Sequence, residues 1–374
     1  MRVCSIKTML GEEKYKRVKN TLKLKFQRKW LKTIYRDSSL NKTVPLNKKL
    51  WAYRKGFLSR RIDQLGLSAD NIGGFLSDYD YMKLAPINGR FVFWIDDKLT
   101  TKYVLAKFNK CLPEYYFYLS NRNPSGVSRL MDCPEGVPSD IEGILKMLES
   151  KGKLALKPVS GAFGSGFVKL GFCSSKYMVN DKETDKAEIC RLMMSAEEYI
   201  VTEYVEMHEE IKKIYPNSLN TIRLLVINEN GDDPFIGIAG IKFGTKRSGF
   251  VDNISSGGVS CWIDTDTGLF SGGFVVSEKK EFVDLVAHPD TGVKLEGCIP
   301  NWRIIEEGIE EICRYIPQIE FMGFDVAVTG DGFKIIEINS APGLNRTSHP
   351  WSERLNGYFS RLLKRKGIRS RNGF

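Results

Sequence analysis

The segment from residue 321 to residue 339 constrains the fold of this chain most strongly. Apolar residues recur at every second position on both sides of the sequence Gly-Asp-Gly at 330–332, and this pattern predicts a β-hairpin that turns at the glycines. Asp325 lies on the first predicted strand, and Glu337 and Asn339 lie two residues apart, hence on one face, of the second. Oxygen ligands on paired strands suit a Mg²⁺ ion that also keeps waters and phosphate oxygens. The hairpin therefore predicts a Mg²⁺ site, and a hairpin with solvated polar residues is the alternative.

A glycine-rich loop is predicted between two further strands, within residues 154–170. The first strand ends at Lys157, and the second resumes at Phe167. Glycine lets a backbone fold closely over phosphates, and its exposed N–H groups form a concavity that binds anions. Lys157 adds a positive charge toward a triphosphate. The segment predicts a phosphate-binding loop, with a turn that binds no ligand as the alternative. The loop residues expected at the phosphates are Gly161, Gly164, Ser165 and Gly166.

Charge is distributed unevenly along the 374 residues. Residues 1–61 hold 19 Lys or Arg and three acidic residues, so this segment alone accounts for the net charge of +11. No helix-turn-helix, zinc-finger or RNA-binding motif accompanies it, and we expect no nucleic-acid partner. The eight cysteines form no C-x-x-C pair, no apolar stretch is long enough to span a bilayer, and the first 30 residues contain no secretory apolar region. These features predict a cytoplasmic protein with reduced thiols.

Residues 12–36 predict a basic amphipathic helix, because apolar residues recur every four positions between Lys and Arg. In one interpretation the apolar stripe packs on the body of the protein. In the other it enters the boundary of an anionic membrane while the basic residues contact headgroups. The second interpretation places the protein peripherally at the inner membrane face. The stripe consists of Val18, Leu22, Phe26, Trp30 and Ile34.

Strands and helices alternate along the rest of the chain, which predicts an α+β or mixed α/β fold. We expect a strand at residues 91–95, a helix at about 100–109 and another helix at 139–149. A run rich in Pro, Gly and Ser at 121–138 predicts a loop or linker. The chain then divides into four segments, at 1–61, 62–138, 139–205 and 206–374.

The glycine-rich loop and the hairpin, in this order, resemble the ATP-grasp superfamily of carboxylate–amine ligases over about residues 95–350. The stretch that begins Asp97-Lys98 resembles the helix whose lysine contacts nucleotide phosphates in D-alanine–D-alanine ligases. Residues 337–349 are similar to their metal-binding strand and the turn after it. The resemblance implies an ATP-grasp fold, in which two α+β lobes grip the nucleotide, here preceded by the basic helical segment. It also implies ATP and Mg²⁺ as cofactors, with the metal at Asp325, Glu337 and Asn339.

Residues 200–205 resemble the hinge strand whose glutamate and backbone hold adenine in this superfamily. The ribose-binding residue is left open between Glu210, which has the expected distance from Glu203, and Asn220, which holds the matching place before Arg223. The nucleotide-binding residues that the resemblance implies are Lys98, Lys157, Gly161, Gly164, Ser165, Gly166, Glu203, Tyr204, Val205, Glu210 and Asn220.

Several stretches resemble particular groups within the superfamily. Residues 220–223 and 246–258 look like the glutamate-adding ligases. Residues 216–223, 288–292 and 299–302 are similar to the sugar-transfer-associated ATP-grasp group, whose members are encountered in surface-polysaccharide gene settings. The implied catalytic residues are Arg223, Arg247 and Asn253. The implied substrate-binding residues are Gly257, Gly258, His288, Asp290, Ser340 and Gly343.

One position departs from the pattern of the D-Ala ligases. They carry an arginine two residues before the metal-binding aspartate, where this chain has Gly323. The resemblance therefore leaves oxyanion stabilisation to Arg223 or Arg247.

The resemblance implies a reaction in two steps. The substrate carboxylate attacks the γ-phosphate of ATP to give an acyl phosphate and ADP, and an amine then displaces phosphate to leave an amide. We expect the acid to be a sugar uronic acid, nucleotide- or lipid-linked, or an amino acid. The alternatives are a kinase that phosphorylates a hydroxyl, a nucleotide-binding module without catalysis, and a polyanion-binding scaffold built on residues 1–61.

Overall fold

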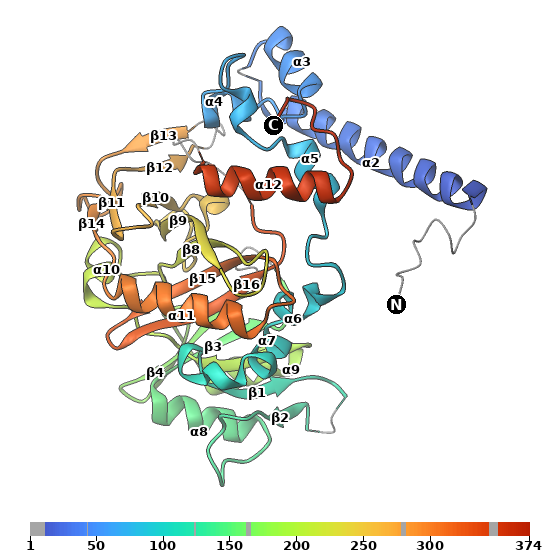
Figure 1. Ribbon diagram of the computed structural model, residues 1–374. Coiled ribbons are helices and arrows are strands. Elements are labelled where there is room, and N and C mark those ends of the chain that lie inside the picture. Colours follow the sequence, from blue (N-terminus) through green and yellow to red (C-terminus); the bar gives the residue numbers. More distant parts are fainter. Residues whose placement is uncertain (1–11, 43, 123–124, 162–165, 278–281, 344–350) are drawn as a thin grey trace. The chain divides into compact units, whose positions relative to one another are not determined.

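The computed structural model describes residues 12–42, 44–122, 125–161, 166–277, 282–343 and 351–374. The chain forms two compact units, one of Met1–Ala85 with Leu344–Phe374 and the other of Pro86–Gly343 (Figure 1). The second unit contains every predicted site residue. No helix of the described residues is long and apolar enough to cross a membrane.

The first unit is helical in its described part. Trp30 is buried against Leu58 and Tyr79, with its ring centroid 5.3 Å from that of Tyr79, and Ile34 packs beside them. This end of the predicted stripe packs within the unit, as the first interpretation expected, whereas the side chains of Val18 and Leu22 lie outside the described residues. The helices are α2 (Glu12–Leu40), α3 (Leu46–Arg54), α4 (Arg61–Leu65), η1 (Ile72–Gly74), α5 (Asp78–Leu84) and α12 (Glu353–Arg365).

Buried polar contacts tie the segments of the first unit together. Asp37 of α2 accepts hydrogen bonds from the backbone N–H of Ser59 at 2.8 Å and from its hydroxyl at 2.6 Å. Near the C-terminus, Nδ2 of Asn372 donates to the carbonyls of Ile72 and Phe75 at 2.6 and 2.8 Å. Buried polar groups need such partners, so these contacts fix the C-terminal tail on the N-terminal helices.

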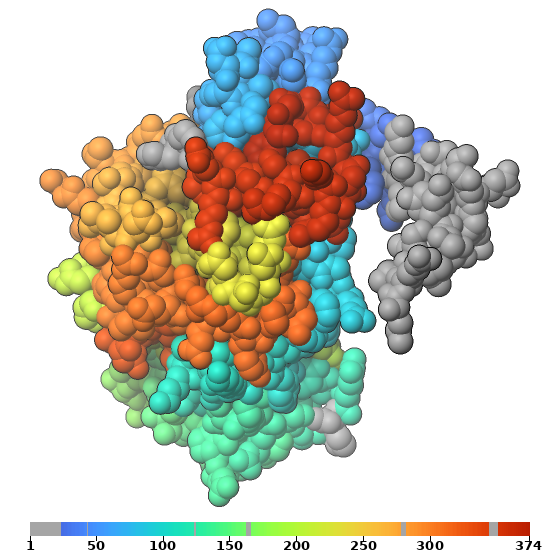
Figure 2. Space-filling model, viewed as in Figure 1, coloured from blue at the N-terminus to red at the C-terminus, as the bar shows by residue number. Residues whose placement is uncertain are grey.

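Helix α12 is amphipathic. Leu355, Tyr358 and Leu362 recur at helical spacing and are buried, whereas the charged residues of the helix are exposed. Atoms of α12 and of the tail after it are visible in red in Figure 2. The C-terminal basic segment thus begins as a helix that packs by its apolar side.

The second unit contains, among its described residues, two antiparallel sheets (Figure 1). Helices α8 (Ile141–Lys151) and α9 (Lys186–Ser195) pack on the first sheet, where Leu148 and Ile189 share a core with Leu156. The strand order of this sheet is β2-β1-β7-β3-β4-β5-β6. Its strands are β1 (Tyr115–Leu119), β2 (Val127–Arg129), β3 (Lys153–Pro158), β4 (Val168–Cys173), β5 (Lys176–Val179), β6 (Lys182–Thr184) and β7 (Tyr199–Glu203).

The second sheet has nine strands in the described part of the chain, with the main order β13-β12-β10-β9-β8-β15-β16. Its strands are β8 (Ile222–Ile227), β9 (Phe235–Phe243), β10 (Val259–Ile263), β11 (Leu269–Ser271), β12 (Gly273–Val276), β13 (Phe282–Leu285), β14 (Glu296–Cys298), β15 (Phe321–Thr329) and β16 (Gly332–Asn339). The other helices of the unit are η2 (Gly89–Val92), α6 (Phe93–Asp96), α7 (Lys98–Val104), η3 (Ala106–Cys111), α10 (Glu209–Ile214), η4 (Ile254–Ser256) and α11 (Trp302–Tyr315).

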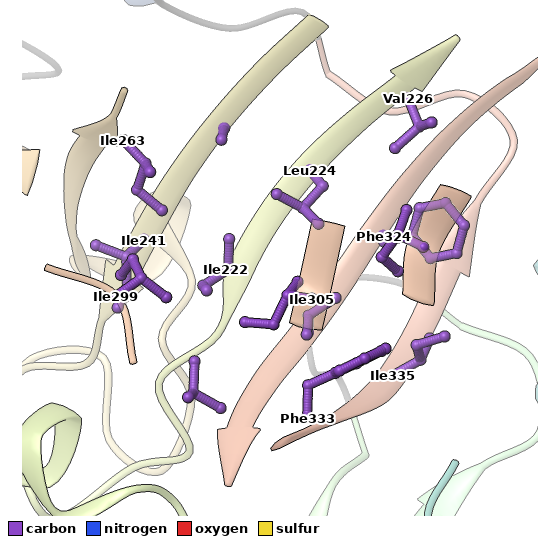
Figure 3. Close-up of a cluster of buried hydrophobic side chains, with 14 of the residues drawn as sticks. Ile222, Leu224, Val226, Ile241, Ile263, Ile299, Ile305, Phe324, Phe333 and Ile335 are labelled. Carbon is purple, nitrogen blue, oxygen red and sulfur yellow. The ribbon is translucent and has the colours of Figure 1, made fainter. Parts of the chain in front are cut away.

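The two faces of the nine-stranded sheet differ in chemistry. Successive strand residues point to opposite faces. One face is apolar and packs on α11, and the other carries Arg223 and Asp325 between the apolar positions of β8 and β15. The apolar face includes Ile222, Leu224, Val226, Ile241, Phe324 and Ile335, with Ile305 of α11 among them (Figure 3).

A β-bulge in β16 interrupts the regular alternation of side chains between the two faces of the sheet. Asp325 lies opposite Glu337, and the next residue of β15 lies opposite Ile335, so Ile336 is the extra residue. Without a bulge, Ile335 and Glu337 would share a face. The extra residue lets Ile335 and Ile338 both enter the core while Glu337 points to the charged face.

Most of the expected elements are confirmed, including the hairpin β15–β16, strand β3 and helix α8. The strand expected at residues 91–95 is wrong, because this segment is helical in η2 and α6. Phe91 and Trp94 stack edge to face at 5.0 Å and pack against the main core, and this packing overrides the strand propensity of aromatic residues. The run at 121–138 contains the short strand β2.

Candidate active site

One face of the nine-stranded sheet collects charged side chains from adjacent strands. Asp325 of β15 lies opposite Arg223 of β8 on one side and opposite Glu337 of β16 on the other. Arg223 holds Asp325 through two hydrogen bonds, from Nε to Oδ1 at 2.8 Å and from Nη2 to Oδ2 at 2.7 Å. Bidentate pairs of this kind are strong and directional. The register of the sheet therefore fixes these side chains relative to one another.

A second cation, Lys242 of β9, completes this charged cluster. Its Nζ lies 2.9 Å from Oδ1 of Asp325 and 3.6 Å from Oδ1 of Asp252, which accepts a hydrogen bond from the N–H of Thr221 at 2.8 Å. Burial opposes the charge of Lys242, but Asp252 and Asp325 outweigh burial and raise its pKa. Burial also opposes ionisation of Asp325, but Arg223 and Lys242 hold the pKa of that carboxyl well below its usual range. The buried carboxylate is thus fully charged and doubly paired.

Glu337 behaves differently from Asp325. Burial and the neighbouring charge of Asp325, to which it is hydrogen-bonded, raise the pKa of Glu337. Lys98 Nζ lies 3.6 Å from Oε2 of Glu337, and Nδ2 of Asn339 donates to Oε1 at 3.2 Å. Two adjacent carboxyl groups repel each other when both are ionised, which is why one of them resists ionisation. A divalent cation bound to both would offset this repulsion.

The donor set of this pair fits Mg²⁺. Asp325, Glu337 and Asn339 offer oxygen atoms from paired strands, and Mg²⁺ prefers a few such ligands together with waters and phosphates. Within the described ranges, no group of three or more His, Cys, Asp or Glu side chains is arranged to hold a metal ion. A site here would therefore use two carboxylates and the amide oxygen of Asn339.

The start of α7 is tied to the end of β3. Asp97 caps the helix by accepting from the N–H of Thr100 at 2.7 Å, and it also accepts from the Ser160 hydroxyl at 3.1 Å. The N–H of Lys98 donates to the carbonyl of Val159 at 3.1 Å. These contacts hold the first turn of α7 in place, and the Lys98 side chain extends from it to Glu337.

The end of β16 is held by the neighbouring helix α6. Ser340 donates to the Asp96 carboxylate from its N–H and from its hydroxyl, both at 2.7 Å. Gly343, also a predicted substrate contact, is exposed. At Gly323 a Cβ atom would collide with the Pro342 side chain, so the backbone path excludes an arginine at this position. The departure from the D-Ala ligase pattern thus has a steric cause.

Lys157, at the end of β3, is buried beside a second cation. Burial and the charge of Lys98 lower the pKa of Lys157 to about 7, against the opposing influence of Glu337 and Glu203. Its Nζ lies 5.4 Å from the ring centroid of Tyr115. An anion beside this amine would favour its charged form, so the position is suited to a phosphate group.

The predicted hinge residues line an open pocket of about 500 Å³. Glu203, Tyr204 and Val205 form one side, and the turn of the β15–β16 hairpin at residues 329–331 forms the other. Lys334 Nζ lies 3.6 Å from Oε1 of Glu203. Burial raises the pKa of Tyr204 to about 12, so its hydroxyl stays neutral. The structure thus brings the expected adenine-binding segment next to the hairpin that carries the carboxylates.

The glycine-rich loop is described only at its ends. Gly164 and Ser165 lie outside the described residues. Gly166 has φ of +80°, and a Cβ atom there would meet the Tyr199 hydroxyl, so both backbone conformation and space require glycine. Gly161 has φ of +154° at the other end of the loop. Glycine is therefore needed for the turn itself, whatever the loop binds.

The two candidate arginines occupy different environments. Arg223 binds Asp325 in the charged cluster, whereas the guanidinium of Arg247 donates to the carbonyl of Val276. Gly257 has φ of +110°, and a Cβ atom there would collide with the side chain of Arg247. The side chain of Arg247 thus packs directly against the backbone of Gly257.

The turn at residues 252–258 places Asn253 and Gly258 next to the charged cluster. The carbonyl of Asn253 accepts from the N–H of Gly258 at 2.9 Å. A Cβ atom at Gly258 would collide with the carbonyl oxygen of Asp252, the cluster residue that faces Lys242. Gly258 is therefore required by close backbone approach.

His288 and Asp290 hold a loop through contacts that do not involve the charged cluster. His288 is buried, with Nε2 2.7 Å from the carbonyl oxygen of Gly244 and its ring stacked on Tyr215 at 4.9 Å. Asp290 accepts from the N–H of Lys246 at 2.7 Å. In the part of the chain that the structure describes, no hydrogen bond or ion pair links either residue to the charged cluster.

The two ribose candidates differ in exposure. Glu210 is exposed, and its hydrogen bond with Lys213 lowers the pKa of its carboxyl. Asn220 is buried, donates to the carbonyl of Tyr215 at 2.6 Å and accepts from the Ser218 hydroxyl at 2.8 Å. Its side chain therefore holds the loop before β8, and Glu210 is the accessible one of the two.

Sequence reasoning missed Lys242, and it gave no role to Asp252 or Lys102, which lay within stretches that matched the superfamily. Lys102 is buried and lies 2.7 Å from Asp132. The available signal was a single lysine within the apolar run 235–243, since a charged residue in a buried strand needs a partner.

Comparison with known proteins gives one family. The model of a family described as sugar-transfer associated ATP-grasp matches residues 81–358. No curated protein matches the chain.

Solved structures give weaker similarities. The D-alanine–D-alanine ligase from Coxiella burnetii is 14% identical, with 75% of this chain and 55% of that chain covered and a TM-score of 0.36. The D-alanyl-alanine synthetase A from Vibrio cholerae is 14% identical, with 73% and 64% covered and a TM-score of 0.41. The D-Ala:D-Ser ligase from Enterococcus faecalis is 12% identical, with 72% and 61% covered and a TM-score of 0.40. The chain therefore spans less than two thirds of the length of each of these proteins.

Proposed function

This chain belongs to the sugar-transfer-associated ATP-grasp family, and we propose that it is an ATP-dependent ligase that joins a carboxylate to an amine. The observation that carries the proposal is the charged cluster on one face of the nine-stranded sheet. Asp325 and Glu337 supply carboxylates of the kind that bind Mg²⁺, while Arg223, Lys242 and Lys98 supply positive charge within ion-pair distance of them. Phosphoryl transfer requires this combination, because catalysis there is positioning and charge stabilisation.

In this proposal Asp325, Glu337 and Asn339 hold Mg²⁺. The bound ion would neutralise charge on the phosphates of ATP. Lys98 and Lys157, which extend from α7 and β3, bind phosphate oxygens, since both amines lie near Glu337. The pocket at 203–205 is the proposed adenine site.

D-Ala ligases carry an arginine where this chain has Gly323. In this proposal Arg223 and Lys242 stabilise the oxyanion in its place. Both are charged, and both already face the carboxylate pair. In the first step a substrate carboxylate oxygen bonds to the γ-phosphorus as the bond to ADP breaks. In the second step the amine nitrogen bonds to the acyl carbon, loses a proton and expels phosphate. Arg223 and Lys242 stabilise the negative charge that develops on the transferring group.

For the substrates we propose a sugar uronic acid, nucleotide- or lipid-linked, or an amino acid as the carboxylate, with an amide formed in surface-polysaccharide biosynthesis. The family description as sugar-transfer associated supports this choice. A cytoplasmic location, with peripheral contact to an anionic membrane through residues 12–36, suits an acceptor on a lipid carrier. Because Trp30 is buried, another side of α2 would make that contact.

The test is a matrix of uronic acids and amino acids against amines, read by ADP release and by mass spectrometry. We expect ADP release that requires both an acid and an amine, with a product lighter than their sum by one water. Glu337→Gln, expected to retain the fold, is the matched inactive control. ADP release with a hydroxyl compound alone, accompanied by its phosphorylation, would replace the ligase by a kinase.

A further inference from the structure

Helix α2 has a second apolar strip that the first unit does not bury. Trp30 is 5% exposed, whereas Leu24, Leu31 and Tyr35 are 54%, 63% and 80% exposed. These three residues are separated by seven and four positions, so they form one line along the helix. The apolar residues of α2 are thus divided between a packed side and an open side.

Positive charge flanks the open strip. Five basic residues lie on one side of the strip on the helix surface, and all five are exposed. In the described part of the chain, no carboxylate forms an ion pair with any of them. Asp37, the acidic residue within 24–40, points inward to Ser59. The five are Lys25, Arg28, Lys29, Lys32 and Arg36.

Other apolar side chains near this end of α2 and on α3 are exposed as well. Leu40, and Leu46 and Leu50 on α3, are also exposed. Residues 24–50 therefore hold six of the sixteen large apolar side chains that are exposed in the described residues. Exposed apolar residues that gather in this way mark an interaction surface more often than scattered ones do.

We propose that the strip of Leu24, Leu31 and Tyr35 docks on an anionic phospholipid bilayer. The strip enters the headgroup boundary, and the flanking cations contact lipid phosphates, as in interfacial amphipathic helices. This inference deepens the peripheral contact proposed above, because it assigns that contact to a side of α2 other than the one that buries Trp30. It does not depend on the ligase chemistry.

Charge decides between a bilayer and other occupants of the strip. A second copy of the chain would bring two rows of like cations together, which is unfavourable. A nucleic acid would satisfy the cations but leave the apolar side chains in water. An anionic bilayer satisfies both kinds of side chain at once, since it offers phosphates and hydrocarbon at adjacent depths.

The experiment is co-sedimentation of the full chain with vesicles of phosphatidylcholine alone and of phosphatidylcholine mixed with phosphatidylglycerol. We expect binding to the mixed vesicles only. The triple variant Leu24→Gln, Leu31→Gln, Tyr35→Gln should lower that binding about 30-fold or more. The matched control Met194→Gln, Leu269→Gln, Ile304→Gln changes side chains of similar exposure in the second unit and should change binding less than about twofold. ADP release should be the same in both variants, which separates this inference from the proposed function.

A charge variant tests the second half of the surface. Lys25→Gln with Arg28→Gln and Lys32→Gln should lower binding to the mixed vesicles at least about tenfold. Thermal unfolding checks the fold, and the single variants Leu31→Gln and Tyr35→Gln replace the triple if it unfolds. Equal vesicle binding by the wild type and the strip variants overturns the proposal. So does a strip-dependent dimer in sedimentation without vesicle binding, or RNA binding that the strip variants leave unchanged.

Discussion

Positive charge is concentrated in two regions of this protein. It is buried and paired in one region and exposed to solvent in the other. Arg223 and Lys242 are enclosed in a sheet face and paired with Asp325. The five basic residues of α2 are exposed to solvent, and none forms an ion pair with a carboxylate among the residues that the structure describes. The first group is positioned by strand register, and the second by the pitch of one helix.

This difference predicts different energetics. A buried ion pair is costly to break, because the remaining partner stays in a poorly solvated site. An exposed cation contributes little to folding, acts over a distance set by salt, and adds to its neighbours when an anionic surface approaches. Buried charge therefore suits chemistry at fixed positions, and exposed charge suits reversible docking.

The largest expected effect is that of Asp325→Asn. It leaves Arg223 and Lys242 facing a neutral amide, so we expect loss of turnover and a free energy of unfolding lowered by about 3–5 kcal/mol. Denaturant unfolding and ADP release measure the two effects. The control Glu183→Gln removes an exposed partner of Lys176 and should cost less than about 1 kcal/mol. Equal stability of the two variants would show that the cluster is not held by its buried charges.

The second effect concerns Lys157. Lys157→Met keeps much of the side-chain volume but removes a charge near Glu337, so kcat/KM for ATP should fall about 100-fold. Steady-state kinetics measures the change, with Lys176→Met on β5, whose amine pairs with the exposed Glu183, as a control outside the site. Unchanged kinetics would make the loop after β3 a simple turn.

The third effect is a pH dependence with a defined sign. The pKa of Lys157 is lowered to about 7 by burial and by Lys98, so the amine is largely neutral above that pH. Because phosphate favours the charged amine, ATP binding takes up a proton, and affinity should fall as pH rises above 7, approaching about tenfold per pH unit.

Calorimetry with a non-hydrolysable ATP analogue measures this slope, and Lys157→Met should abolish it. The same shift affects folding. The unfolded chain binds the proton more tightly than the folded chain between the folded pKa and the ordinary pKa of 10.5, so stability should rise with pH across that window. Lys157→Met should therefore be most stabilising below pH 7. A slope that persists in the variant would assign the titration to another group.

The smallest effect is that of salt on the buried cluster. Raising the salt from about 0.1 M to about 1 M shortens the Debye length from about 10 Å to about 3 Å, so vesicle binding through α2 should fall at least about tenfold. The destabilisation caused by Lys242→Met should change by less than about 0.5 kcal/mol over the same range. If both respond equally, the two regions do not differ in solvent screening.

Local signals in the sequence were sufficient for the hairpin, the strand before the glycine-rich loop and the helix α8. Alternation and turn glycines report on neighbouring residues, so Asp325 and Glu337 could be placed on paired strands. The bulge at Ile336 could not be predicted, because it depends on which residues the core on α11 accepts.

Long-range pairing was not visible in the sequence. Lys242 meets Asp325 across 83 positions, through strands whose order no local pattern specifies. The basic helix shows a similar limit. Periodicity predicted one apolar stripe on α2, but the open strip with Leu31 and Tyr35 becomes apparent only when Trp30 is seen to be packed.

The central claim is that the face with Asp325 and Glu337 binds Mg²⁺ together with ATP. Calorimetric titration of a non-hydrolysable ATP analogue, with and without Mg²⁺, tests it most directly in the wild type and in Glu337→Gln. Because Gln keeps the size of Glu337 and removes its repulsion with Asp325, the variant should keep the fold, and the thermal unfolding midpoint checks this. We expect Mg²⁺ to strengthen binding at least about tenfold in the wild type and to have little effect in the variant. Equal enhancement by Mg²⁺ in both proteins would contradict the assignment of this site.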